Sequence, residues 1–93
     1  MRSRYSAYAK GLVPYLRDTW HPLTRPADLQ IDPDLRWTGL TIVGTEAGGV
    51  DDESGVVEFV AEHASAAGPG RLHERSRFGR VDGAWRYIDG ETR

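Results

Sequence analysis

A charged and aromatic cluster opens the chain, in the stretch MRSRYSAYAKG at residues 1–11. At helical spacing, Arg4 lies on the same stripe as Tyr5 and Tyr8 and points to one side of a helix. A guanidinium stabilises an anion, and a tyrosine adds packing area with a hydroxyl at its tip. Glu74, near the other end of the chain, supplies a carboxylate that could pair with this cluster. Unpaired in an apolar cavity, the same carboxylate would serve as a general base.

Two hypotheses follow for Glu74. In the first, Arg4 forms a buried ion pair with Glu74, or failing that with Asp89, and fixes the helix against a sheet; such a carboxylate is a poor base. In the second, Glu74 takes a proton from an acidic C–H group or a water, while Arg4, Tyr8 and His21 stabilise negative charge. His21 ends a helical segment, so its ring is also suited to bonding free carbonyls there. The residue types favour the first hypothesis.

The spacing of apolar residues predicts the elements that hold these side chains. In the first 20 residues, apolar and aromatic residues recur at helical spacing, interrupted by Gly11 and Pro14. The pattern predicts one short helix over residues 2–10 and another over about 13–19, because proline fits the first turn of a helix. Residues 22–36 contain three prolines and no clean period, which is typical of an ordered loop.

From Trp37 onward the pattern changes to that of strands. Four segments rich in strand-forming residues, separated by turn residues, predict four strands. The dipeptide at residues 82–83 is the strongest hairpin signal in the chain. Two helices followed by an antiparallel meander predict an α+β fold with the helices on one face of a curved sheet. The strand segments are WTGLTIVGTE, GVVEFVAEHA, RLHERSRFGRV and AWRYID.

The turn positions also predict which residues pair across the sheet. A turn at Ala66–Pro69 sets Phe59 opposite Ser76, and the two-residue turn at 82–83 sets Ser76 beside Asp89. Aromatic and polar side chains then gather on the inner face, under the helices, and line a small cavity of mixed polarity. We expect the cavity lining to contain Arg4, Tyr5, Tyr8, Trp20, Phe59, Glu74, Ser76, Phe78, Trp85, Tyr87 and Asp89.

Basic residues are concentrated in and beside the third predicted strand. One interpretation is a nucleic-acid-binding stripe, and the other is a solvated face neutralised by carboxylates. The predicted pairing sets Glu62 opposite His73 and Glu58 opposite Arg77, and each such pair contributes about 0.2–1 kcal/mol. Aromatic side chains for base stacking are missing from this face, so the neutralised face is favoured and no nucleic-acid partner is expected. The basic residues are Arg71, Arg75, Arg77, Arg80 and Arg86.

Length and composition limit the class of protein. The chain has 93 residues, 39% of them hydrophobic, and a net charge of −2. These values predict a single domain over residues 1–93 and favour a homodimer, which would bury further surface. The chain has no cysteine, which excludes cysteine-ligated zinc, and we expect neither a metal site nor a cofactor. No stretch approaches the roughly 20 apolar residues that span a membrane, and we expect a cytoplasmic protein without membrane contact.

Four segments, in order, resemble one protein family. MRSRYSAYA, YLRDTWHP, VVEFVAEH and HERSRFGRVDGAWRYIDG are together similar to the YchJ-like family of bacterial proteins. The resemblance is weakest over residues 22–36 and 44–54. It implies a nuclear transport factor 2-like fold, a cone in which a bent antiparallel sheet wraps around helices. Longer members carry a cysteine-rich, zinc-type SEC-C segment whose ligands have no counterpart here, so we expect a trimmed or naturally shortened member.

Two functions remain open. The first is a non-catalytic domain that binds a small ligand or a partner protein. The second is a cofactor-free isomerase, dehydratase or hydrolase acting on a small organic molecule, with Glu74 as general base and His21 as a further candidate. The wider fold includes both kinds of protein, so the fold by itself does not decide between them. The expected Arg4–Glu74 pair favours the non-catalytic role.

Overall fold

A computed structural model describes residues 2–32 and 34–93. Two short helices come first and four strands follow, in the order that the sequence predicts. The turn between the second and third strands is two residues shorter than expected. The elements are α1 (Arg2–Lys10), α2 (Val13–Asp18), β1 (Arg36–Ala47), β2 (Ser54–Ser65), β3 (Gly68–Val81) and β4 (Ala84–Thr92).

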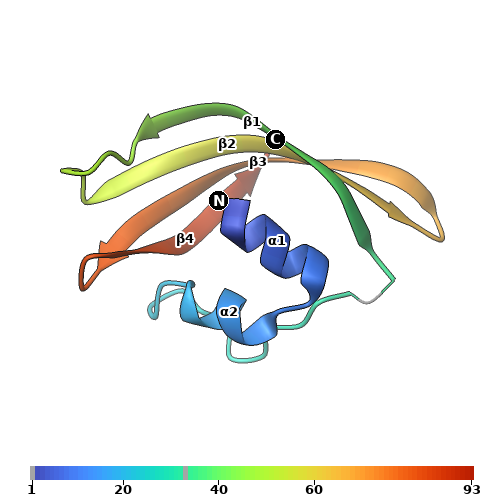
Figure 1. Ribbon diagram of the computed structural model, residues 1–93, viewed down its shortest axis with the longest axis horizontal. Coiled ribbons are helices and arrows are strands. Elements are labelled where there is room, and N and C mark those ends of the chain that lie inside the picture. The colour runs from blue at the N-terminus through green and yellow to red at the C-terminus, as the bar shows by residue number, and fades with distance from the viewer. Residues whose placement is uncertain (1, 33) are drawn as a thin grey trace.

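The four strands form one antiparallel sheet in the order β1-β2-β3-β4. The sheet arches over the two helices, with α1 between the sheet and α2 (Figure 1). This arrangement confirms the predicted α+β class, with the N-terminal helices on one face of a curved sheet. None of the helices within residues 2–32 and 34–93 is long and apolar enough to cross a membrane.

Gly11 and Pro14 separate the two helices, as the sequence predicts. Gly11 has a φ of 71°, a conformation that glycine adopts without strain at the end of a helix. Pro14 occupies the first turn of α2, where its missing N–H removes no helical hydrogen bond. The chain therefore folds back at Gly11, and Ala7 and Leu16 become almost fully buried, with exposed fractions of 1% and 0%. Full burial of a leucine contributes about 1.5–3 kcal/mol.

The pairing of β2 with β3 differs by two residues from the predicted pairing. Phe59 lies opposite Glu74 and not Ser76, because the turn consists of only Ala66 and Ala67. The predicted turn at residues 66–69 is therefore wrong. A shift of two residues keeps every side chain on its expected face, since the side-chain period of a strand is two.

The β3–β4 hairpin forms at Asp82-Gly83, as predicted, and sets Phe78 opposite Tyr87. A register shift follows between Phe78 and Arg77, so that Arg77 lies opposite Asp89. The extra residue in β4 turns Asp89 to the outer face of the sheet, away from the helices. The predicted pairing of Ser76 with Asp89 is therefore wrong.

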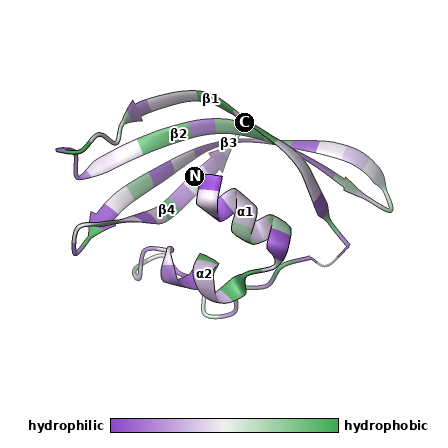
Figure 2. Cartoon of the chain, viewed as in Figure 1, coloured by the Kyte–Doolittle hydropathy of each residue, from purple (hydrophilic) through white to green (hydrophobic). Residues whose placement is uncertain are grey.

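The core lies where the concave face of the sheet meets the helices. It is small, and its five buried hydrophobic residues are Ala7, Leu16, Phe59, Ala61 and Phe78. Along β2, short hydrophobic stretches are interrupted by hydrophilic residues (Figure 2), and its two buried residues, Phe59 and Ala61, lie two positions apart on one face. Two polar residues, Arg4 and Ser76, are as buried as this core. Their surroundings define the candidate site.

The outer edge of β4 is paired to the segment that follows α2. The N–H of Tyr87 donates to the carbonyl oxygen of Thr19, and the N–H of His21 donates to the carbonyl oxygen of Tyr87, both at 2.7 Å. Trp20 thereby forms an isolated parallel bridge with Tyr87. These two hydrogen bonds attach the end of α2 to the strand that carries Tyr87.

Candidate functional site

Arg4 is buried between the helices and the sheet, with only 4% of its surface exposed. Its Nη1 donates to the carbonyl oxygen of Leu16 at 3.0 Å and to the hydroxyl of Thr19 at 2.6 Å. Both acceptors lie at the C-terminal end of α2, where free carbonyl groups favour a cation. Among the described residues, Arg4 has no carboxylate within ion-pair distance. The predicted ion pair of Arg4 with Glu74 or Asp89 is therefore wrong.

Two aromatic rings flank the guanidinium of Arg4. Its central carbon lies 4.7 Å from the centre of the Tyr87 ring and 5.2 Å from the centre of the Trp20 ring. The two rings meet edge to face with their centres 4.8 Å apart. Such contacts contribute about 0.5–2 kcal/mol each, more when they are desolvated. Burial lowers the pKa of the Arg4 guanidinium, because a low dielectric disfavours the charged form.

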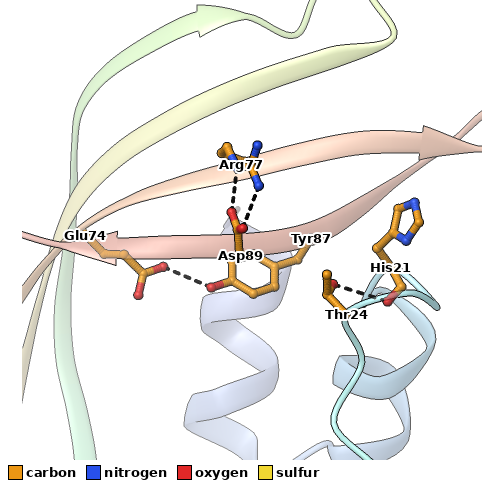
Figure 3. A network of polar contacts seen from close by, with 6 residues as sticks. All are labelled: His21, Thr24, Glu74, Arg77, Tyr87 and Asp89. Carbon is orange, nitrogen blue, oxygen red and sulfur yellow. Dashed lines mark hydrogen bonds and ion pairs between the residues drawn. The ribbon is translucent and has the colours of Figure 1, made fainter.

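Glu74 accepts hydrogen bonds from two hydroxyl groups. One donor is Ser76, which is fully buried, and the other is Tyr87, at 3.4 Å. Figure 3 shows the Glu74 carboxylate pointing to the tip of the Tyr87 ring. Burial, and after it the neighbouring charge of Glu74, raises the pKa of the Tyr87 phenol, so Tyr87 remains a hydrogen-bond donor. Within the described part of the chain, hydroxyl groups and not a cation thus hold the Glu74 carboxylate.

Asp89 lies on the outer face of the sheet. Its two carboxylate oxygens accept from Nε and Nη2 of Arg77, both at 2.6 Å (Figure 3). The hydrogen bond from Arg77 lowers the pKa of the Asp89 carboxyl and raises the pKa of the guanidinium. Asp89 is therefore not part of the cavity, contrary to the prediction, because the bulge in β4 reverses its side.

His21 lies outside the cavity. Its Nδ1 accepts a hydrogen bond from the N–H of Leu23 at 3.1 Å, and its carbonyl oxygen accepts from Thr24 (Figure 3). The ring therefore stabilises the turn after α2 and does not bond a helical carbonyl through Nδ1. The structure does not bring His21 together with Glu74, the other candidate catalytic residue.

Two cavities on the concave side of the sheet are lined by residues that the structure describes. The larger has a volume of about 490 Å³ and is lined by elements α1, α2 and all four strands. The smaller, of about 200 Å³, lies between α1 and the strands β1, β2, β3 and β4. Arg4 and Tyr87 line both cavities, so they lie at the boundary between them.

Most of the predicted lining residues border one of these cavities. Phe78 and Trp85 line the larger, whereas the smaller is lined by Tyr5, Tyr8, Phe59 and Glu74. Trp20, Ser76 and Asp89 line neither. Trp20 instead covers Arg4, and Ser76 is packed within the sheet against Glu74.

Several residues that line the larger cavity were not predicted from the sequence. The sequence predicts a first strand that ends at Glu46 and a polar connection over residues 47–55, which have no regular spacing. β1 continues to Ala47, however, and Gly48 and Gly55 face each other where the β1–β2 hairpin narrows. Only the pairing of the two strands brings this segment beside the helices. The lining residues missed are Ser3, Tyr15, Thr19, Thr45, Ala47, Gly48, Gly55, Val56, Val57 and Arg86.

Arg80, expected among the exposed arginines, instead holds the β1–β2 connection in place. Its guanidinium donates to the carbonyl oxygens of residues 49, 50 and 52, and to that of Gly83 in the β3–β4 turn, at 2.8–3.2 Å. It also lies 4.2 Å from the centre of the Trp85 ring. One side chain thus ties two turns together at the end of the sheet that borders the larger cavity.

Carboxylates pair with two arginines of the sheet's outer face, Arg75 and Arg77, although with different partners from those predicted. Glu58 is joined to His73 at 2.7 Å, and Arg75 donates to Glu46 at 2.6 Å. The hydrogen bond with His73 lowers the pKa of the Glu58 carboxyl. The predicted pairing of Glu58 with Arg77 is wrong, because the two-residue register difference sets Glu58 opposite Arg75.

The described residues contain no group of three or more histidine, cysteine or carboxylate side chains that could hold a metal ion. The two candidate catalytic residues, Glu74 and His21, are also not brought together in one cavity. Glu74 borders the smaller cavity and not the larger one, and His21 borders neither cavity. The larger cavity therefore offers binding groups, chiefly a guanidinium and aromatic rings.

Relatives in other bacteria match nearly the whole chain. A UPF0225 protein of Streptomyces coelicolor is 55% identical over 91 residues, which are 98% of this chain and 70% of that protein. UPF0225 proteins of Streptomyces avermitilis and Chromobacterium violaceum are 50% and 53% identical, and the matches cover 62% and 69% of their lengths. The chain thus spans about two thirds of the length of these relatives.

A solved structure has the same fold. The solution structure of a SEC-C motif containing protein from Rhodopseudomonas palustris superimposes with a TM-score of 0.82 at 30% identity, over 98% of this chain and 73% of that one. This match confirms the cone of helices and curved sheet. Residues 1–90 match the family described as YchJ, middle NTF2-like domain. The chain therefore belongs to the YchJ family and corresponds to its middle, nuclear transport factor 2-like domain.

Proposed function

We propose that this domain is a non-catalytic binding module that takes a small molecule into the larger cavity. The observation that carries the proposal is the cavity itself, which has about 490 Å³ of space between the helices and the sheet. Binding sites for small molecules have volumes of about 300–1,000 Å³ and combine apolar walls with a few polar groups. Phe78, Trp85 and Tyr87 supply such walls here, and Thr19 and Arg4 supply polar groups.

The chemistry of the lining supports binding over catalysis. A general base must reach the proton that it removes, directly or through one water. Among the described residues that line the larger cavity there is no aspartate, glutamate, histidine, lysine or cysteine. Arginine and tyrosine remain, and a guanidinium that stays protonated cannot accept a proton.

One observation favours a second candidate function. Glu74 is free of the arginine that would have made it a poor base, and it borders the smaller cavity. A cofactor-free isomerase, dehydratase or hydrolase with Glu74 as base would use that cavity, whose volume of about 200 Å³ admits only a very small substrate. Turnover that is lost in Glu74→Gln but kept in Glu62→Gln would establish this alternative. A protein partner, a homodimer and a cytoplasmic location stay predictions from the sequence.

A fragment screen observed by ¹H–¹⁵N NMR tests the binding proposal. We expect the bound fragments to shift the amide signals of Gly48, Gly55 and Trp85, which border the larger cavity. Val57→Trp should weaken these shifts, because Val57 lines the cavity from β2 and an indole would occupy part of its space. Val60→Trp places the same group on the opposite face of the strand and should leave binding unchanged. Shifts that persist undiminished in Val57→Trp would contradict the proposal.

A further inference from the structure

We propose that the ligand of the larger cavity is a small organic anion, with a ring-sized apolar body and an anionic group that binds the guanidinium of Arg4. This inference rests on the proposed function, because it names the chemical class of the molecule that the cavity takes. It concerns the larger cavity only. The smaller cavity contains the Glu74 carboxylate, which would repel an anion.

The first support is the uncompensated charge of Arg4. An ionised side chain that is buried needs an opposite charge or full hydrogen bonding, since it has lost its water. Arg4 is 4% exposed, and its neighbours are a carbonyl, the hydroxyl groups of Thr19 and Tyr8 and two aromatic rings, none of which carries a negative charge at neutral pH. A bound anion would supply the missing charge. Burial already lowers the pKa of Arg4, and an anion would offset that effect.

The second support is the set of donors that Arg4 retains. A guanidinium has five N–H donors in a planar fork, which matches the two oxygens of a carboxylate or phosphate. Both hydrogen bonds that Arg4 makes to Leu16 and Thr19 use the same nitrogen, Nη1. Nε and Nη2 therefore have donors left for a ligand, while Nη1 keeps the group in place at the end of α2.

The third support is the positive charge of the residues that line the larger cavity. Two arginines, Arg4 and Arg86, are among the residues that border the larger cavity, and none of the described lining residues is acidic. A cleft with one sign of charge and low-dielectric walls concentrates ligands of the opposite sign. A cation would find no carboxylate there and would be repelled by the two guanidinium groups, so the lining favours anions.

The fourth support is the aromatic wall beside Arg4. The rings of Phe78 and Tyr87 meet edge to face with their centres 5.7 Å apart, and Trp85 and Tyr15 also line the cavity. Such surfaces bind flat apolar groups and contribute little to a fully hydrated inorganic ion. The ligand therefore combines an anionic group with an apolar body of about the size of one or two rings.

Titrations of the wild-type protein with matched probes test this inference. The probes are benzoate, phenyl phosphate, neutral benzamide and inorganic phosphate, followed by amide shifts of Gly48, Gly55 and Trp85. We expect benzoate or phenyl phosphate to bind at least ten-fold more tightly than benzamide and than inorganic phosphate. The stronger of the two organic anions identifies the anionic group. If neither benzoate nor phenyl phosphate binds more tightly than benzamide, the anion inference is overturned and the proposed function stays intact.

A second measurement follows the Arg4 side chain itself, first in the wild-type protein and then in variants. The Nε–H signal of Arg4 should shift with benzoate and not with benzamide, because only the anion reaches the guanidinium. Arg4→Met should remove the preference for the anion, Arg4→Lys should keep part of it, and Arg71→Met, an exposed control on the outer face, should keep all of it. An unchanged Nε–H signal at saturating benzoate would overturn the assignment to Arg4. If neither these probes nor any screened fragment shifts the lining residues, the proposed function itself fails.

Discussion

The guanidinium of Arg4 lies 4.7 Å from the centre of the Tyr87 ring, and these two side chains border both cavities of the interior. Arg4 comes from the first helix and Tyr87 from the last strand, so their contact joins the two ends of the chain. Tyr87 also donates to Glu74. One tyrosine thus lies between a buried cation and a carboxylate that do not pair with each other.

Arg4 should contribute strongly to stability. We expect Arg4→Met to lower the free energy of unfolding by about 2–4 kcal/mol, because the Leu16 carbonyl and the Thr19 hydroxyl lose their donor and two ring contacts are lost. Urea unfolding followed by circular dichroism measures the change. Arg71→Met, at an exposed position, should change stability by less than about 0.5 kcal/mol. If Arg4→Met also lowers the free energy of unfolding by less than about 0.5 kcal/mol, the contacts of Arg4 do not stabilise the fold as proposed.

The raised pKa of Tyr87 predicts a dependence of stability on alkaline pH. The folded state holds the proton more tightly than the unfolded state, whose tyrosine pKa is 10.0. The stabilisation is therefore complete below pH 10 and is lost as the pH rises above it. Absorbance at 295 nm should show one phenol that ionises only together with alkaline unfolding. Tyr87→Phe should remove this late step, and a titration that still contains it would contradict the assignment.

The hydrogen bond between Ser76 and Glu74 predicts a non-additive pair of substitutions. Glu74→Ala leaves the buried Ser76 hydroxyl without this acceptor and should cost about 1–3 kcal/mol. Ser76→Ala removes the hydroxyl itself, so Glu74→Ala should cost less in that background. Chemical denaturation of the four proteins of this cycle gives the coupling energy. Additive costs would show that the contact contributes nothing of its own.

The narrow end of the β1–β2 hairpin should not accept a side chain at Gly55. A Cβ there would lie 2.7 Å from the Cα of Gly48 and 2.9 Å from its backbone nitrogen. Because both atoms belong to the backbone, Gly55→Ala should force the strands apart and cost about 1–3 kcal/mol. Gly44→Ala, on the same hairpin with no atom near the added Cβ, is the matched control. Thermal unfolding compares the two, and equal melting temperatures would contradict the prediction.

The elements of the fold could be predicted from local patterns. The helical spacing in the first 20 residues, interrupted at Gly11 and Pro14, is a property of neighbouring residues, and so is the hairpin signal at Asp82-Gly83. Helix ends and tight turns depend on local φ values and on missing donors, which residue types specify directly. The burial of Arg4 was also correctly expected from its position on the helical stripe.

The partners of the buried polar groups could not be predicted in this way. A two-residue turn at Ala66-Ala67 and a bulge before Asp89 have no strong signal in the sequence, yet they decide which residues lie opposite each other. Neither feature changes the hydrophobic pattern of the core strands, so that pattern fits the observed pairing and the predicted pairing equally well.

By itself, the sequence determined the order of helices and strands, the α+β class and the family, because these follow from local spacing and from segments that are similar in order. Only the tertiary structure decided that Arg4 binds the end of α2 and two aromatic rings while Glu74 binds Ser76 and Tyr87. The physical reason is distance: a buried charge takes whichever partners the packing of helix on sheet brings within reach, and residue type alone does not specify them.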